Sequence, residues 1–151
     1  MNHDEGHAQL AIELDDGAVI STRIECGDMT TLGHELLTHF NDLRGRAKLM
    51  QAIPFRLHSI RDGEIYYSSK IIDTNLVPTH MTHASVGTYL SRTLHWWNAL
   101  GNSMESNTEG ETFTFEFPTH WYLFTVTGRW MYMNHDMNIP EALTLEVVQN
   151  G

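Results

Sequence analysis

Apolar and polar residues alternate at the start of the chain, and this alternation predicts a β-hairpin. Residues 8–14 carry leucine or isoleucine at every second position, and residues 18–26 resume the pattern after the turn sequence Asp-Asp-Gly at 15–17. Side chains two positions apart share one face of a strand, and Asp-Gly is a common hairpin turn. We therefore expect two antiparallel strands joined at residues 15–17.

The apolar spacing then changes to three and four residues, which predicts a helix over residues 29–45. Asp28 or Thr30 is the expected N-cap, and Gly45 is the expected stop. A second hairpin follows, in which residues 53–60 and 65–72 flank a turn at 61–64.

The longest helix-like stretch is residues 82–101, where apolar residues recur on one stripe. Thr82 or Ser85 is placed to accept the first-turn N–H groups, and Gly101 is placed to end the helix. The stripe consists of Val86, Leu90, Thr93, Leu94, Trp97 and Leu100. We expect this helix to pack on a sheet.

Strand-like patterns dominate the last third of the chain, after a polar, acidic loop at 102–111. Residues 112–117 alternate phenylalanine with polar residues, whereas residues 120–127 are apolar on both faces. A strand of the second kind is expected at the centre of a sheet that is covered on both sides, or facing a partner. Residues 128–133 and 142–148 are the remaining expected strands.

These patterns predict an α+β fold, built as one domain over residues 1–151. We expect a mainly antiparallel, curved sheet of seven or eight strands with two packed helices. The expected element order is ββαββαββββ. Whether the sheet closes on itself is left open by the pattern.

The chain is acidic, with 9 lysine and arginine residues against 19 aspartate and glutamate residues and a net charge of −10. Residues 44–70 are the exception, because six bases there face two acids. Direct nucleic-acid binding is disfavoured, since affinity for phosphates depends on a basic footprint. A local basic strip remains as an alternative: Arg44, Arg46, Lys48, Arg56 and Arg61.

No apolar run approaches the roughly 18 residues of a membrane span, and the first residues form no apolar signal segment. We therefore expect a cytoplasmic protein without membrane contact. The single cysteine, Cys26, has no second cysteine for an internal disulfide. We interpret it as a buried structural thiol rather than a nucleophile.

Histidine is overrepresented, with ten residues, and this raises the question of a metal site. His34 and His39 flank Glu35 but are five residues apart, so they cannot face one ion from one helix as zinc-protease histidines do. A histidine that is partly buried and hydrogen-bonded in the core is the simpler interpretation of His39. No cofactor is expected, although converging imidazoles and carboxylates would suit zinc or iron. The candidate ligands are Glu35, His39, His80, His83, His120 and His135.

Aromatic residues are concentrated in the long helix and the late strands. The simpler interpretation is an aromatic core. The alternative is an interface or pocket, because tryptophan and tyrosine dominate binding hot spots. The aromatic residues concerned are Trp96, Trp97, Trp121, Tyr122, Phe124, Trp130 and Tyr132.

These features favour a small, acidic, non-enzymatic binding protein, an inhibitor or adaptor that docks on a basic macromolecular surface. A protein partner is expected, with the chain itself a monomer or homodimer. The expected interaction residues are Glu105, Glu109, Glu111, Trp96, Trp121, Tyr122 and Trp130. Two alternatives stay open: a histidine- or metal-dependent enzyme or ligand pocket, and a structural subunit that pairs through its late strands.

Overall fold

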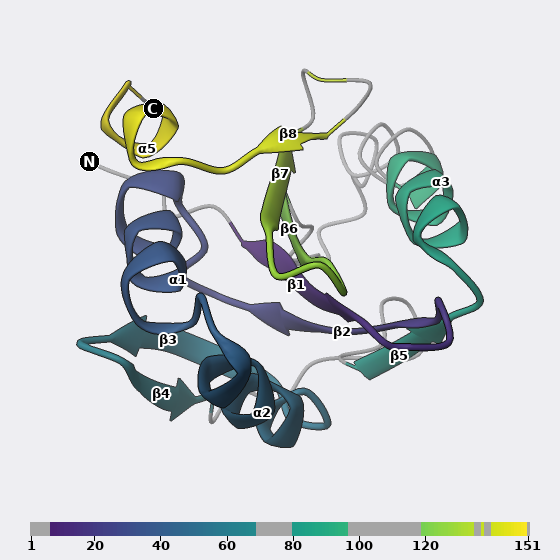
Figure 1. Ribbon diagram of the computed structural model, residues 1–151, viewed down its shortest axis with the longest axis horizontal. Helices are drawn as coiled ribbons and strands as arrows, with labels where there is room; N and C mark the ends of the chain where they lie inside the picture. Colours follow the sequence, from purple (N-terminus) through teal and green to yellow (C-terminus); the bar gives the residue numbers. More distant parts are fainter. Residues whose placement is uncertain (1–6, 69–79, 97–118, 135–136, 138–139, 151) are drawn as a thin grey trace, which may run out of the picture.

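The computed structural model describes residues 7–68, 80–96, 119–134, 137 and 140–150, with the backbone only for residues 80, 81, 92–96 and 150. The described residues form one eight-stranded sheet with helices on both faces (Figure 1). The strands are β1 (Ala8–Glu13), β2 (Val19–Ile24), β3 (Leu57–Arg61), β4 (Glu64–Tyr67), β5 (His80–His83), β6 (His120–Phe124), β7 (Trp130–Asn134) and β8 (Glu141–Ala142).

The strand order is β4-β3-β2-β1-β6-β7-β8, with β5 beside β2. Two of the pairings are parallel, β1 with β6 and β2 with β3. The α+β class is therefore confirmed, whereas a mainly antiparallel sheet is wrong, because the sheet is mixed. Sequence periodicity gives the same alternation for both pairings, since it reports faces and not strand direction.

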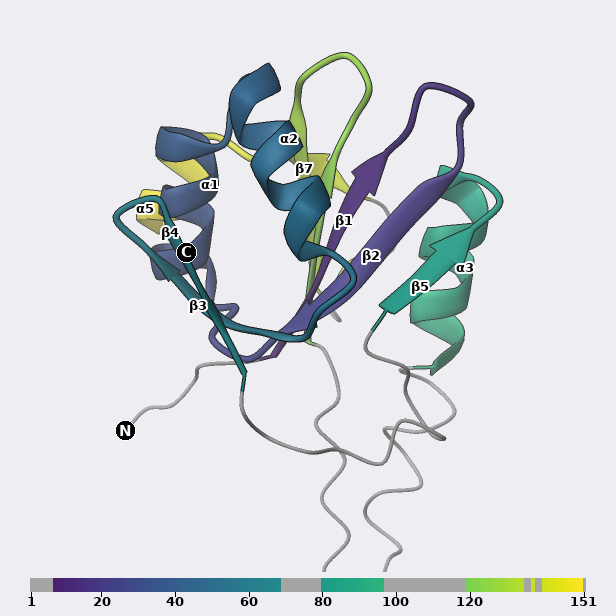
Figure 2. The same cartoon turned by 90° about the horizontal axis from the view of Figure 1, so that it is seen from below.

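Short helices cover both faces of the sheet. Figure 2 shows α1, α2 and α5 on one side and α3 on the other. The helices are the π-helical segment η1 (Met29–Gly33), α1 (His34–His39), α2 (Leu43–Ala52), α3 (Val86–Trp96) and α5 (Leu145–Asn150). The expectation of two packed helices was wrong, because the described residues contain four α-helices.

Both expected hairpins are confirmed, although residues 69–72 of the last expected strand lie outside the described residues. β1 and β2 pair antiparallel from Ala8 opposite Ile24 to Glu13 opposite Val19. In the second hairpin, Arg61 lies opposite Glu64. The two residues between them, Asp62 and Gly63, have positive φ angles of 53° and 78°, as a tight two-residue hairpin turn requires.

The helix expected over residues 29–45 is broken. It begins as expected at Asp28, whose Oδ2 accepts the N–H of Thr31 at 3.3 Å, but it ends at Phe40. A new helix, α2, then begins after Asp42, whose Oδ1 accepts the N–H of Gly45 at 2.9 Å. A Cβ on Gly45 would lie 2.5 Å from the Cα of Phe40. The glycine therefore permits the close approach of two helices instead of ending one.

Other element boundaries also differ from the expected ones. Thr82 lies in β5, and Ser85 caps α3 by accepting the N–H of Thr88 at 3.2 Å. The strand expected over 53–60 begins only at Leu57, because α2 extends to Ala52. The strand expected over 142–148 was wrong, since the chain turns into α5 after Thr144, whose hydroxyl accepts the N–H of Val147 at 3.2 Å. Residues 97–118, which include the expected strand at 112–117, lie outside the described residues.

The core has two halves, one on each face of the sheet. β6 lies between β1 and β7 and is buried on both faces, which confirms the expectation of a central strand. Tyr122 and Phe124 join the larger apolar cluster under α1 and α2, and Trp121 and Leu123 join the smaller cluster with Tyr89 of α3.

Two buried tryptophans with the same exposure, 2%, differ in their hydrogen bonding. Nε1 of Trp130 donates to the carbonyl oxygen of Phe40 at 3.0 Å and so holds the end of α1 on the sheet. Nε1 of Trp121 has no hydrogen-bond partner among the described residues. The pair provides a matched test of one buried hydrogen bond.

We predict that Trp130→Phe lowers the free energy of unfolding by about 1–3 kcal/mol more than Trp121→Phe does, because only the first change leaves a buried carbonyl without its donor. Urea denaturation of both variants measures the difference. Equal losses would show that the bond to Phe40 contributes nothing to stability.

Candidate functional site

Several residues expected to bind a partner lie in the core. Trp121, Tyr122 and Trp130 are 2%, 0% and 2% exposed, so their side chains do not reach the surface in this structure. These three aromatic residues therefore belong to the core, as the simpler interpretation of the sequence predicted. Trp96 is described by its backbone alone, and Glu105, Glu109 and Glu111 lie outside the described residues.

Glu35 and His39, both candidate metal ligands, contact the turn between β3 and β4. The two carboxylate oxygens of Glu35 accept the N–H groups of Asp62 and Gly63, each at 3.0 Å. Nε2 of His39 lies 3.9 Å from Glu35, and its ring packs on Gly63, where a Cβ would approach Cγ of His39 to 3.2 Å. These contacts give both side chains a structural role. The expectation that His39 is partly buried in the core was wrong, because its side chain is 41% exposed.

His83 lies in a buried polar cluster beneath α3. Its Nε2 is 3.5 Å from Oγ of Ser21, which also accepts a hydrogen bond from Nε2 of Gln9 at 2.9 Å. The ring of His83 meets the ring of Tyr89 edge to face at 5.2 Å between centroids. A serine beside a histidine has the composition of a nucleophile and its base. Here Ser21 and His83 are 0% and 2% exposed, so the hydroxyl is not presented to a substrate.

His120 lies in a second polar cluster, at the opposite end of β6 from its turn to β7. Its Nδ1 is 2.7 Å from the hydroxyl of Tyr132, which also accepts from Nδ2 of Asn134 at 3.3 Å. The ring of Tyr122 stacks near His120, and its hydroxyl donates to the carbonyl of Gly27 at 2.8 Å. Burial, the neighbouring Tyr132 and then Asp28 raise the pKa of Tyr122 well above its usual value of 10.0.

The described part of the chain contains no group of three histidine, cysteine or acidic side chains that would hold a metal ion. His80 is described by its backbone alone, and His135 lies outside the described residues. Cys26, interpreted as a buried thiol, is partly exposed and lies just beyond β2.

The basic strip expected within residues 44–70 does not form a continuous surface. Arg56 is 8% exposed, and its Nε lies 3.3 Å from a carboxylate oxygen of Glu25. Nη2 of Arg46 donates to the carbonyl of Glu13 at 3.0 Å, and Nζ of Lys48 donates to the carbonyl of Gly63 at 2.6 Å. Three of the five bases are therefore held by the fold.

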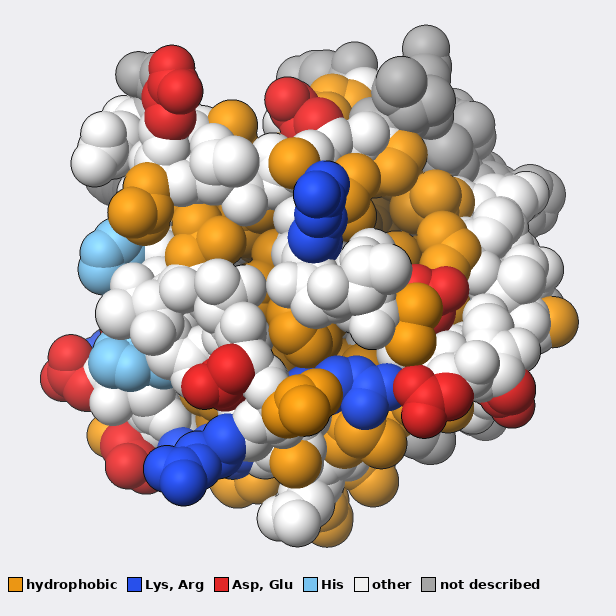
Figure 3. All heavy atoms as spheres, viewed as in Figure 1, with side chains coloured by type: hydrophobic (Ala, Val, Ile, Leu, Met, Phe, Trp, Pro, Cys, Tyr) orange, Lys and Arg blue, Asp and Glu red, His pale blue; other side chains and the backbone are white. Residues whose placement is uncertain are grey.

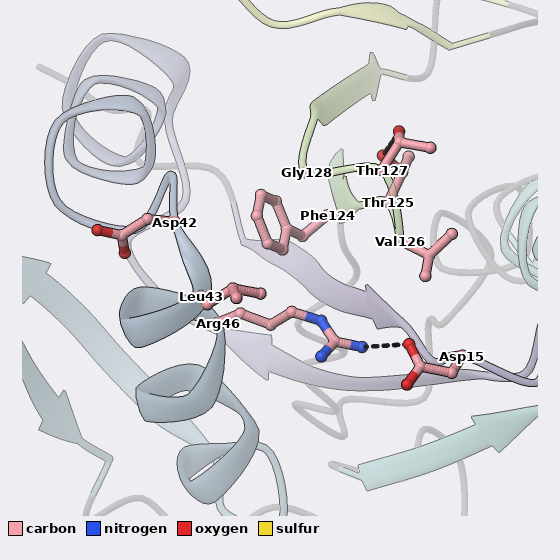
Figure 4. A pocket seen from close by; sticks show the side chains of 9 residues that line it. All are labelled: Asp15, Asp42, Leu43, Arg46, Phe124, Thr125, Val126, Thr127 and Gly128. Carbon is pink, nitrogen blue, oxygen red and sulfur yellow. Dashed lines mark hydrogen bonds and ion pairs between the residues drawn. The ribbon is translucent and has the colours of Figure 1, made fainter.

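An open cavity of about 270 Å³ lies at one end of the sheet and is a candidate site in the described structure (Figure 4). The turn between β1 and β2, the turn between β6 and β7 and the first turn of α2 meet there. The lining residues are Asp15, Asp42, Leu43, Arg46, Phe124, Thr125, Val126, Thr127 and Gly128.

The cavity combines an apolar floor with exposed apolar walls. Phe124, at the end of β6, is 1% exposed, whereas Leu43 and Val126 are 79% and 48% exposed. Single exposed apolar side chains are common on protein surfaces, but two that flank the same cavity form an apolar patch that a partner can cover. In the space-filling view, apolar side chains fill a hollow on this face beside acidic and basic ones (Figure 3).

Arg46 is the one basic side chain that lines the cavity within the described residues. Its guanidinium reaches toward the β1–β2 turn, where Nη2 lies 3.8 Å from Oδ1 of Asp15. Glu13 braces the other turn, because its Oε1 accepts the N–H of Val126 at 3.0 Å. These contacts hold the turns around the cavity.

Little in the sequence pattern pointed to this site. Leu43 belongs to an apolar stripe that would be buried in one continuous helix, and Val126 belongs to an apolar run that would be buried in a longer strand. The stripe is exposed at Leu43 because the helix breaks at Phe40, and Val126 is exposed because β6 ends at Phe124.

We predict that Glu35→Ala lowers the free energy of unfolding by about 1–3 kcal/mol, because two turn N–H groups lose their acceptors. Glu64→Ala is the control, since Glu64 is an exposed residue of the same hairpin and its change should stay within about 0.5 kcal/mol. Thermal and urea unfolding measure both. A Glu35→Ala protein as stable as the control would contradict the structural role.

We predict that stability falls at alkaline pH, in part through Tyr122. A folded-state pKa raised above the unfolded value gives stability that is complete below pH of about 10 and is lost as pH rises through the folded-state pKa. Tyr122→Phe should be less stable at neutral pH, because it loses the bond to Gly27, and should show a shallower alkaline fall. Urea unfolding across alkaline pH measures both curves, and parallel curves would contradict the assignment.

No helix among the described residues is long and apolar enough to cross a membrane. The sequence matches no protein-family model. Searches of curated proteins and of solved structures likewise gave no significant match to this chain.

Proposed function

We propose that this protein is a small, acidic, non-enzymatic binding protein that docks on a positively charged surface of another protein. The observation that carries the proposal is the open cavity between Leu43 and Val126, with Phe124 as its floor. The net charge of −10 supports a basic partner, because opposite charge speeds association and selects the partner.

The size of the cavity favours one side chain of a partner over a free ligand. Pockets for drug-sized ligands usually measure about 300–1,000 Å³, and this cavity of about 270 Å³ is smaller and open. An apolar side chain of the partner that enters between Leu43 and Val126 would cover both and contact Phe124. Such a buried apolar anchor is typical of binding hot spots.

Carboxylates at the rim of the cavity supply the negative charge that would attract a basic partner. The side chain of Asp15 is 90% exposed, and Asp16 beside it is also exposed. Lysine or arginine residues of the partner, next to its apolar anchor, would face the turn between β1 and β2. We include Glu105, Glu109 and Glu111 in the proposed interaction surface because of their charge in the sequence.

A histidine-dependent pocket is the second candidate. The hydrogen bond of 2.7 Å between His120 and Tyr132, with Asn134 on the same hydroxyl, joins groups that can move protons. Elemental analysis of the untagged protein discriminates between the two, since stoichiometric zinc or iron would favour this candidate.

The docking proposal predicts that short lysine- and arginine-rich peptides bind this protein when they carry one phenylalanine. Peptides that carry alanine at that position should bind with lower affinity. Fluorescence anisotropy at low and high salt measures the affinity. We expect Leu43→Ser and Val126→Ser each to weaken binding about tenfold, because each removes a cavity wall. Added salt should also weaken binding, since exposed charges are screened.

Leu145→Ser is the matched control, because Leu145 is 52% exposed on α5 and does not line the cavity. It should bind as the unchanged protein does. Replacing both Asp15 and Asp16 by asparagine should remove the salt dependence contributed by the turn. Binding that ignores salt, or that survives both wall substitutions, would contradict the proposal.

A further inference from the structure

The edge strand β4 presents a second exposed apolar surface, remote in sequence from the cavity walls. β4 is the last strand of the sheet on its side, and β3 is its only partner among the described strands (Figure 1). Phe55, Tyr66 and Tyr67 are 56%, 49% and 54% exposed, and the rings of Phe55 and Tyr67 meet edge to face at 5.7 Å. We call these three residues the aromatic edge.

The hydrogen-bonding direction of β4 follows from its neighbours. Arg61 and Glu64 flank a two-residue turn and therefore form a hydrogen-bonded pair. The N–H of Ser68 also points toward the β3 side, where it donates to the carbonyl of Arg56 at 3.0 Å. Because direction alternates along a strand, the backbone N–H and C=O groups of Ile65 and Tyr67 point away from β3.

β4 has only part of the protection that edge strands usually have, because it is short and begins with the charged Glu64. Its four residues, Glu64–Tyr67, contain no proline and no lysine, and the irregular register of the hairpin comes from β3 at Leu57 and Ser59. An exposed, regular strand with outward N–H and C=O groups is a template for another strand. The register and the charges along β4 indicate which strand pairs with it.

We propose that β4 pairs antiparallel with β4 of a second copy of this chain, centred on Tyr66, so that the two sheets become one. With Tyr66 opposite its counterpart, Ile65 lies opposite Tyr67, and both of these residues carry the outward groups that such a pair must exchange. Glu64 then lies opposite Ser68, so the register places no like charges together. Tyr66 meets Tyr66 across the twofold axis, and aromatic cross-strand pairs are stabilising.

The charge distribution favours this surface for contact between copies. Two chains of net charge −10 repel each other, and the acids are concentrated outside residues 44–70, where six bases outnumber two acids. β4 lies in this segment. Self-association through β4 therefore brings together the least acidic parts of both molecules and leaves the cavity, on other elements, available to a different partner.

The proposal is tested by the mass of the untagged, full-length protein in multi-angle light scattering and native mass spectrometry across a concentration series. We expect a dimer. Tyr66→Lys should weaken dimerisation at least about tenfold, because two lysines would face each other at the axis. Tyr66→Phe should retain the dimer, and Leu43→Lys, at the exposed cavity wall, is the charge-matched control that should also retain it.

A charge-exchange experiment tests the register itself. The Tyr66→Lys and Tyr66→Glu proteins should each be monomeric alone and should form a heterodimer when mixed, because lysine then faces glutamate. Circular dichroism of each variant confirms that it is folded. A monomeric unchanged protein, a dimer insensitive to Tyr66→Lys, or folded variants that do not combine when mixed would each overturn the proposal.

Discussion

The structure depends on the parallel pairing of β1 with β6, which joins an early and a late segment of the chain at the centre of the sheet. Ala8 to Ile12 lie opposite His120 to Phe124, and both strands are buried on both faces. Parallel strands need a long crossover and cover on both sides. The helices η1, α1, α2 and α5 cover one face and α3 covers the other, so both faces of this pair have the cover that they need.

A second constraint is that β2 shares one of its edges between two strands. β5 pairs with residues 19–22 of β2, whereas β3 meets β2 only at Ile24. The buried ion pair between Glu25 and Arg56 lies at this junction, where Ser68 also donates to the carboxylate of Glu25. The hairpin of β3 and β4 is thereby held to the sheet by one end, and no described strand pairs with the outer edge of β4.

These constraints divide the chemically interesting residues into buried and exposed sets. His83, Ser21 and Trp121 lie inside the sheet layers, where they specify packing. The exposed apolar side chains lie instead where elements stop: Leu43 after the helix break and Val126 in a turn at the cavity, and Tyr66 and Tyr67 on the last strand. A binding role for the cavity and a self-association role for β4 thus use separate parts of one fold.

Local patterns in the sequence were enough to predict both hairpins and the two-sided burial of β6, and they narrowed each of two helix caps to two residues, of which the structure uses Asp28 and Ser85. These follow from side-chain periodicity and turn chemistry, which act over a few residues. Strand direction, the helix break near Gly45 and the helical end after Thr144 became clear from the folded structure alone. Each of these depends on contacts between distant segments, and so does the cavity, whose three walls come from turns far apart in the chain.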